Sequence, residues 1–74
     1  MLAEGRPPIE LRDVHERFAA LAVEPEPVRS VRGLGLAVAE HWLIHLPAGP
    51  TRDQAIAALG DAVDLAVKAS THAA

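Results

Sequence analysis

The chain has no cysteine and no tyrosine, and only one phenylalanine and one tryptophan among its 74 residues. Without cysteine there can be no disulfide bond and no thiolate metal site. A chain of this length buries only about 60% of the surface that its unfolded form exposes, so its core is small. Below about 70–80 residues a core usually needs additional support. With disulfides excluded, we expect that support to come from self-association.

An excess of positive charge and a long apolar run are also missing. Seven Lys and Arg against ten Asp and Glu give a formal net charge of −3, so the field of the whole protein does not attract DNA or an anionic membrane. No apolar run approaches the roughly 20 residues of a membrane helix. The amino terminus also lacks the basic and apolar regions of a signal peptide. We therefore expect a cytoplasmic protein that binds neither DNA nor a membrane.

Half of the residues are apolar, mainly Ala, Leu and Val, and many recur at the three- and four-residue spacing of amphipathic helices. Residues 1–8, with a glycine and two prolines, are expected to form a flexible lead-in. A short helix is predicted over residues 9–23, ended by the prolines of the EPEP segment. Its apolar stripe consists of Leu11, Val14, Phe18 and Leu21.

Two longer helices are predicted over residues 27–46 and 52–69, separated by the PAGP turn. Thr51 and Gln54 match a capping box, which predicts that the last helix opens at Thr51. The short connection requires the two helices to be antiparallel, and residues 70–74 are expected to fray. The predicted fold class is a single all-α domain with a short N-terminal helix followed by a long antiparallel αα-hairpin.

The helix predicted over residues 27–46 carries two adjacent apolar stripes. Together they are wider than the surface that one partner helix covers, which indicates a second partner and hence an oligomer. Gly33 and Gly35 lie inside this helix, where each weakens it by roughly 1 kcal/mol relative to alanine. Their presence predicts a close approach of another helix or of a ligand to the backbone.

The EHWLIH segment places His41 and His45 four residues apart on one helical face, which is the spacing of two-histidine zinc sites. The zincin pattern places its glutamate directly after the first histidine, whereas Glu40 precedes it here. Neither His15 nor His72 can be assigned as a third ligand. We therefore predict no metal site and interpret the two histidines as core or interface residues.

Trp42 is the largest apolar side chain and is predicted to anchor the core or a subunit interface. Its flat ring, like that of Phe18, could instead stack on a ring of a ligand. The sequence alone does not separate these alternatives.

Arg29 and Arg32 lie three residues apart in the first turns of the helix predicted over residues 27–46. Guanidinium groups match phosphate oxygens, and the start of a helix adds free amides and a positive dipole end. The same dipole makes basic residues unfavourable there, so they are either tolerated surface charges or functional ones. We predict a phosphate-binding site at these two arginines, which Arg17 could join in an assembly.

Catalytic chemistry is not indicated. No serine or threonine has a base and an orienting acid arranged around it, and the chain has no glycine-rich phosphate loop. Asp61 and Asp64 share a helical face and are interpreted as a solvated stripe. The sequence therefore predicts a binding protein with no catalytic residues and no cofactor.

The segment RGLGLAVAEHWLIHLPAGPTRDQAIAALGDAVDLAVKA, residues 32–69, resembles the small helical-hairpin domain of many phage proteins, including the anti-defence sponges that counter CBASS and Thoeris immunity. Upstream, Arg17 and Phe18 resemble the "RF" start of that family. The further points of likeness are Arg32 early in the helix, AE at 39 and 40, LP followed by Gly49 at the turn, and the AI..L..AV..A..A pattern from Ala55 to Ala69.

The resemblance implies a homo-oligomer, for example a hexamer, acting in the cytoplasm of the phage host. Such an assembly would sequester cyclic oligonucleotide or cyclic ADP-ribose-type immune signals without cleaving them. On this reading the arginines at 17, 29 and 32 bind phosphate, and Phe18 and Trp42 contact rings. The alternative is an oligomeric helical hairpin that serves as a structural or protein-interaction module and binds no small ligand.

Overall fold

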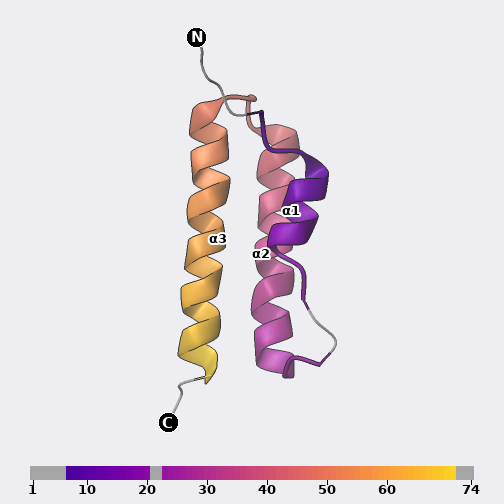
Figure 1. Ribbon diagram of the computed structural model, residues 1–74, viewed down its shortest axis with the longest axis vertical. Helices are drawn as coiled ribbons and strands as arrows, with labels where there is room; N and C mark the ends of the chain where they lie inside the picture. Colours follow the sequence, from indigo (N-terminus) through magenta and orange to yellow (C-terminus); the bar gives the residue numbers. More distant parts are fainter. Residues whose placement is uncertain (1–6, 21–22, 72–74) are drawn as a thin grey trace.

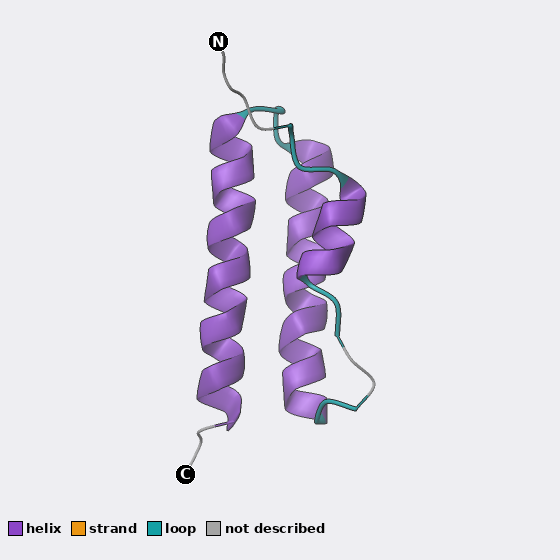
Figure 2. Cartoon of the chain, viewed as in Figure 1, coloured by secondary structure: helices purple, strands orange, loops and turns teal. Residues whose placement is uncertain are grey.

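In the computed structural model, the described part of the chain, residues 7–20 and 23–71, consists of helices and their connections. The helices are α1 (Leu11–Arg17), α2 (Glu26–His45) and α3 (Pro50–Thr71). No strand occurs in these residues, which confirms the all-α prediction (Figure 2). None of the described helices is long and apolar enough to cross a membrane.

The two long helices dominate the shape of the molecule. α2 and α3 lie side by side along most of their length, and residues 46–49 connect them at one end (Figure 1). α1 packs mainly against α2. The result is an elongated body of 49 × 20 × 18 Å. Most of its packing contacts are therefore made between two helices that are neighbours in the sequence.

α1 is shorter than predicted. It starts at Leu11 because Glu10 and Asp13 form a reciprocal capping box, in which the Glu10 amide donates to Asp13 Oδ2 at 2.9 Å. It ends at Arg17, and residues 19 and 20 are not helical, so the predicted end at residue 23 is wrong. Phe18 leaves the helix to bury its ring between α2 and α3, and this tertiary contact overrides the local helical pattern.

α2 begins and ends within one residue of its predicted limits. Pro25 is the N-cap, and a second proline occupies the first turn, where no intrahelical amide donor is needed. At the other end, the Leu46 amide donates to the Trp42 carbonyl at 3.0 Å, and Pro47 then prevents the helix from continuing.

α3 is two residues longer than predicted at each end. It begins at Pro50, and the Asp53 amide donates to the Gly49 carbonyl at 3.1 Å. Thr51 therefore lies inside the first turn, and the predicted capping box with Gln54 is wrong. At the C-terminal end, residues 70 and 71 are helical instead of frayed, and residues 72–74 lie outside the described part.

The core is small, as expected for a chain of this length. No polar or charged residue is buried in the described part of the chain. The two largest fully buried side chains, Val14 and Phe18, both come from or directly follow α1, so the short helix contributes more to the core than its length suggests. The buried apolar side chains are Val14, Phe18, Val28, Ala39, Ile56 and Val63.

Gly35 confirms the predicted close approach to the backbone, whereas Gly33 does not. A Cβ atom at Gly35 would lie 2.6 Å from Val63 Cγ2 and 3.2 Å from the Phe18 ring. A Cβ atom at Gly33 would meet nothing within 4 Å. Gly35 therefore allows α2, α3 and Phe18 to meet at one point.

Arg52 holds the segment before α1 against the rest of the molecule. Its side chain is only 8% exposed. The guanidinium donates to the carbonyl oxygens of Leu43 at 3.2 Å and Ile9 at 3.4 Å, and the Ile9 amide donates to Asp53 Oδ2 at 3.2 Å. These bonds fix residue 9 beside the start of α3, which sets where α1 begins.

Candidate functional site

The predicted phosphate ligand Arg17 reaches from the end of α1 to two acidic residues of α3. Its Nη2 lies 3.0 Å from Asp64 Oδ2 and 3.3 Å from Asp61 Oδ1. The hydrogen bond with Asp64 raises the pKa of Arg17, and the same bond holds the pKa of the Asp64 carboxyl below its ordinary value. Both groups therefore remain charged at neutral pH and attract each other.

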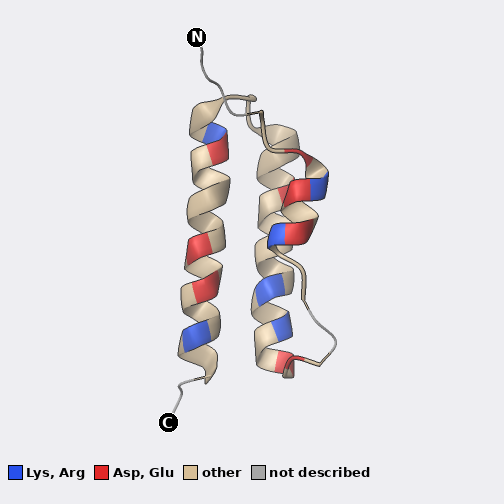
Figure 3. Cartoon of the chain, viewed as in Figure 1, with Lys and Arg blue, Asp and Glu red and all other residues tan. Residues whose placement is uncertain are grey.

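Arg32 of α2 converges on the same carboxylate. Its Nη1 lies 3.9 Å from Asp64 Oδ1, while its Nε donates to both oxygens of Glu24 at 3.0 and 3.2 Å. The structure thus brings Arg17 and Arg32 together around Asp64, although these residues lie on three different segments. Figure 3 shows one basic position of α2 at the level of an acidic position of α3.

Arg29, the third predicted phosphate ligand, forms its ion pair with Glu26 one turn earlier, at 3.8 Å. Its side chain is 46% exposed, so this pair contributes little to stability. All three arginines therefore contact a carboxylate of their own chain. A phosphate at Arg17 and Arg32 would have to displace or share Asp64.

Gly60 shapes the path of the Arg17 side chain. A Cβ atom at this position would lie 2.8 Å from Arg17 Cζ and 2.9 Å from Arg17 Nε. The missing side chain lets the guanidinium lie flat across α3 and reach the acidic residues. The Arg17 Cζ atom also lies 5.9 Å from the centre of the Phe18 ring, within cation–π range.

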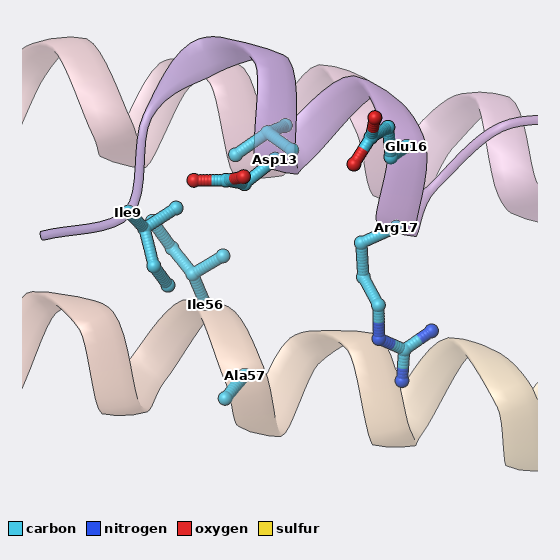
Figure 4. A pocket seen from close by; sticks show the side chains of 7 residues that line it. Ile9, Asp13, Glu16, Arg17, Ile56 and Ala57 are labelled. Carbon is cyan, nitrogen blue, oxygen red and sulfur yellow. The ribbon is translucent and has the colours of Figure 1, made fainter. Parts of the chain in front are cut away.

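A pocket of about 360 Å³ lies between α1 and α3. Ile56 and Ala57 line its α3 side, Ile9 lines it from the segment before α1, and the side chains of Asp13 and Glu16 lie at its α1 side (Figure 4). Arg17 also lines the pocket, and its guanidinium extends from α1 toward α3. Two carboxylates and one guanidinium therefore border the pocket, so it has no excess of positive charge that would suit a phosphate.

The two aromatic side chains differ in their availability to a ligand. Phe18 is 1% exposed in the core, so its ring has almost no surface that a ligand could contact in this structure. Trp42 is half-buried and packs against the core cluster. Its position agrees with the prediction of a core anchor and leaves part of the indole accessible.

A shallow apolar groove lies between α2 and α3. We call it the groove face, and none of its residues is charged. Val38 and Ala62 lie on it, whereas Glu40 and Asp64, two residues further along each helix, pair with α1 residues. Two residues correspond to about 200° of helical turn, so the groove face is opposite α1. It is lined by Val31, Leu34, Gly35, Val38, Leu59, Ala62, Val63 and Ala66.

The histidines divide into two groups. His15 Nε2 lies 2.6 Å from Glu40 Oε2, which links α1 to α2. The rings of His41 and His45 lie beside each other with centroids 4.3 Å apart and a tilt of 38°. Both are exposed, so their interpretation as core residues is wrong, and their interpretation as interface residues remains a prediction.

Comparison with known proteins adds no family to this geometry. No family model, curated protein or solved structure matched the chain. The resemblance to phage helical-hairpin proteins therefore remains a prediction.

Some residues that shape these surfaces were not singled out from the sequence. Arg52 has no distinguishing pattern in the sequence, and Asp61 and Asp64 fit the pattern of a solvated stripe. Ile9 lies 43 positions from Arg52, and Arg17 lies 44 and 47 positions from Asp61 and Asp64, so periodicity gives no signal for these contacts. Gly60 had one signal, which was its position inside an otherwise good helical pattern.

Proposed function

We propose that this chain is an antiparallel αα-hairpin module that associates with further copies of itself through the groove face. The observation that carries the proposal is an uncharged groove along both long helices of a chain with a small core of its own. Burying such a surface is favourable by roughly 25 cal/mol per Å². A chain of this size gains by covering it.

A second copy suits this surface because the groove face is complementary to itself. α2 contributes a projecting side chain, Leu34, which is 69% exposed. α3 contributes the small side chains of Ala62 and Ala66, which allow a close approach. Around a twofold axis, the leucine of each copy faces the alanines of the other.

The molecule also has enough surface for such an interface. A standard interface buries about 800 Å² of each partner, roughly one-sixth of the 5101 Å² accessible surface. The absence of charged groups from the groove face means that no ion must be desolvated when two copies meet.

The change Leu34→Glu tests this proposal. A carboxylate at this position would lose its water on association and find no charged partner in the groove. We expect the mass measured by light scattering during size-exclusion chromatography to fall from that of an oligomer to that of one chain. The helical content measured by circular dichroism should be unchanged, because Leu34 is exposed in the single chain.

Val23→Glu is the matched control. Val23 is 89% exposed and lies in the loop before α2, away from the groove face. The Val23→Glu change introduces the same charge in place of another exposed aliphatic side chain, and the oligomer should persist. Equal dissociation by both variants, or a wild-type chain that remains single at high concentration, would rule the proposal out.

A second candidate function is the sequestration of cyclic oligonucleotide or cyclic ADP-ribose-type immune signals by such an oligomer. One observation favours it: guanidinium groups from two different segments meet around a single carboxylate. A phosphate is also an oxyanion and would suit the same two guanidinium forks. The carboxylate that already lies between them competes with a phosphate for this place.

Two opposite changes test this candidate by calorimetric titration with a panel of cyclic di- and trinucleotides and cyclic ADP-ribose. Arg32→Ala should weaken binding, whereas Asp64→Asn should strengthen it because it removes the competing charge. The oligomer mass should be the same in both variants. If no member of the panel binds wild type or Asp64→Asn, the chain is an interaction module and not a sponge.

A further inference from the structure

The exposed histidine pair on α2 is not among the residues that line the groove face. His41 and His45 follow Leu34 and Val38 at three- and four-residue spacing, so they continue the same row toward the end of the helix. In the described part of the chain neither imidazole has a hydrogen bond or an ion pair, and their contact is with each other. Two adjacent imidazoles therefore have their ring nitrogens available.

We infer that His41 and His45 form a two-imidazole chelate for a divalent transition cation of the zinc and nickel class. Residues four apart on a helix lie on adjacent turns of one face, which is the arrangement that lets two imidazoles share an ion. A nitrogen–metal distance of about 2.0–2.1 Å places the ring centroids roughly 5 Å apart. The observed separation is 4.3 Å, so small rotations of two exposed side chains complete the geometry.

The position of the pair on α2 also favours a cation. His45 is the last residue of the helix, and both rings lie within its last two turns. The unpaired carbonyls there give this end of a helix a partial negative charge, which stabilises a positive ion nearby. Spacing and helix position are independent observations, and both favour the same class of ligand.

The chelate uses two protein ligands, and water completes the coordination. The described residues contain no group of three or more His, Cys, Asp or Glu side chains that could surround an ion. His15 belongs to a different site, because its Nε2 is engaged with Glu40. The site is therefore open and accessible, unlike the closed four-ligand sites that hold structural zinc.

Calorimetric titration of the full chain with nickel chloride and with zinc chloride, in a buffer that does not chelate metals, tests this inference. We expect one ion per chain, and an affinity that falls on acidification because protonated imidazoles cannot bind metal. His41→Ala and His45→Ala should each weaken binding by more than tenfold, since losing even an outer-shell partner typically costs 10–100-fold. Magnesium, which prefers oxygen ligands, should give no heat.

His15→Ala is the matched control, because it removes an imidazole that is already paired and should leave the nickel affinity unchanged. In the wild-type chain, nickel should also raise the midpoint of thermal unfolding, and this shift should disappear in both single variants of the pair. Circular dichroism should show the same helical content in all three variants. An equal loss of affinity in His15→Ala, or binding that survives in His41→Ala and His45→Ala, would overturn the inference.

Discussion

Replacing Gly35 with alanine should destabilise the protein, although alanine is the better helix former. A Cβ atom there would lie 2.6 Å from Val63 Cγ2 and 3.2 Å from the Phe18 ring. The neighbouring Val63 is branched at Cβ and stiff, so it cannot rotate away at low cost. Overpacking of this kind typically costs about 1–3 kcal/mol. We expect a lower midpoint in urea unfolding followed by circular dichroism.

A glycine-to-alanine substitution two residues earlier, at Gly33, should change the stability in the opposite direction. Gly33 lies in the same helix, and a Cβ atom there would meet nothing within 4 Å. Gly33→Ala should therefore stabilise the protein by roughly 0.5–1 kcal/mol, through helix propensity alone. Both variants must be compared with wild type at one protein concentration, because the proposed assembly would add to the apparent stability. If Gly35→Ala were as stable as Gly33→Ala, the packing of α2 on α3 and Phe18 would be wrong.

Phe18→Ala should cause the largest loss of stability of any single truncation in the chain. Phe18 is the largest fully buried side chain, and truncation of a buried phenylalanine typically costs about 3–5 kcal/mol. It also removes the ring that holds the end of α1 between the two long helices. We expect a large decrease in the urea midpoint, together with a change in the fluorescence of Trp42, which packs against the same cluster.

Leu11→Ala provides the comparison for this prediction. Leu11 belongs to the same short helix, but it is 45% exposed. Its truncation should change the free energy of unfolding by no more than about 0.5 kcal/mol, as is usual for a surface position. Similar effects of the two substitutions would mean that α1 does not dock in solution as it does here.

The long helices could be predicted closely from the sequence, because their apolar residues repeat regularly over five or more turns. Their limits were correct to within two residues, and the turn prolines explain why. The first helix was overextended because its end depends on a tertiary contact. Phe18 fits the helical spacing, but in the folded chain it leaves the helix to reach Gly35 and Val63.

The candidate sites were predictable only in part. The guanidinium groups of Arg17 and Arg32 do lie near each other, but the acidic residue between them could not be foreseen. Asp64 lies 47 positions from Arg17, and the pairing depends on where α1 packs against α2, from which the Arg17 side chain reaches α3. Sequence spacing reports which residues share one helix face, and it contains no information about which faces meet.

The two sides of the α2–α3 layer differ, because α1 closes one of them and leaves the other bare. A subunit with an association surface on one side only has no free association surface once its neighbours are bound. The oligomer is then closed, with a fixed number of subunits, whereas subunits with association surfaces on two opposite sides continue into a filament. By covering one side of the α2–α3 layer, the seven-residue α1 would thus keep the proposed oligomer closed.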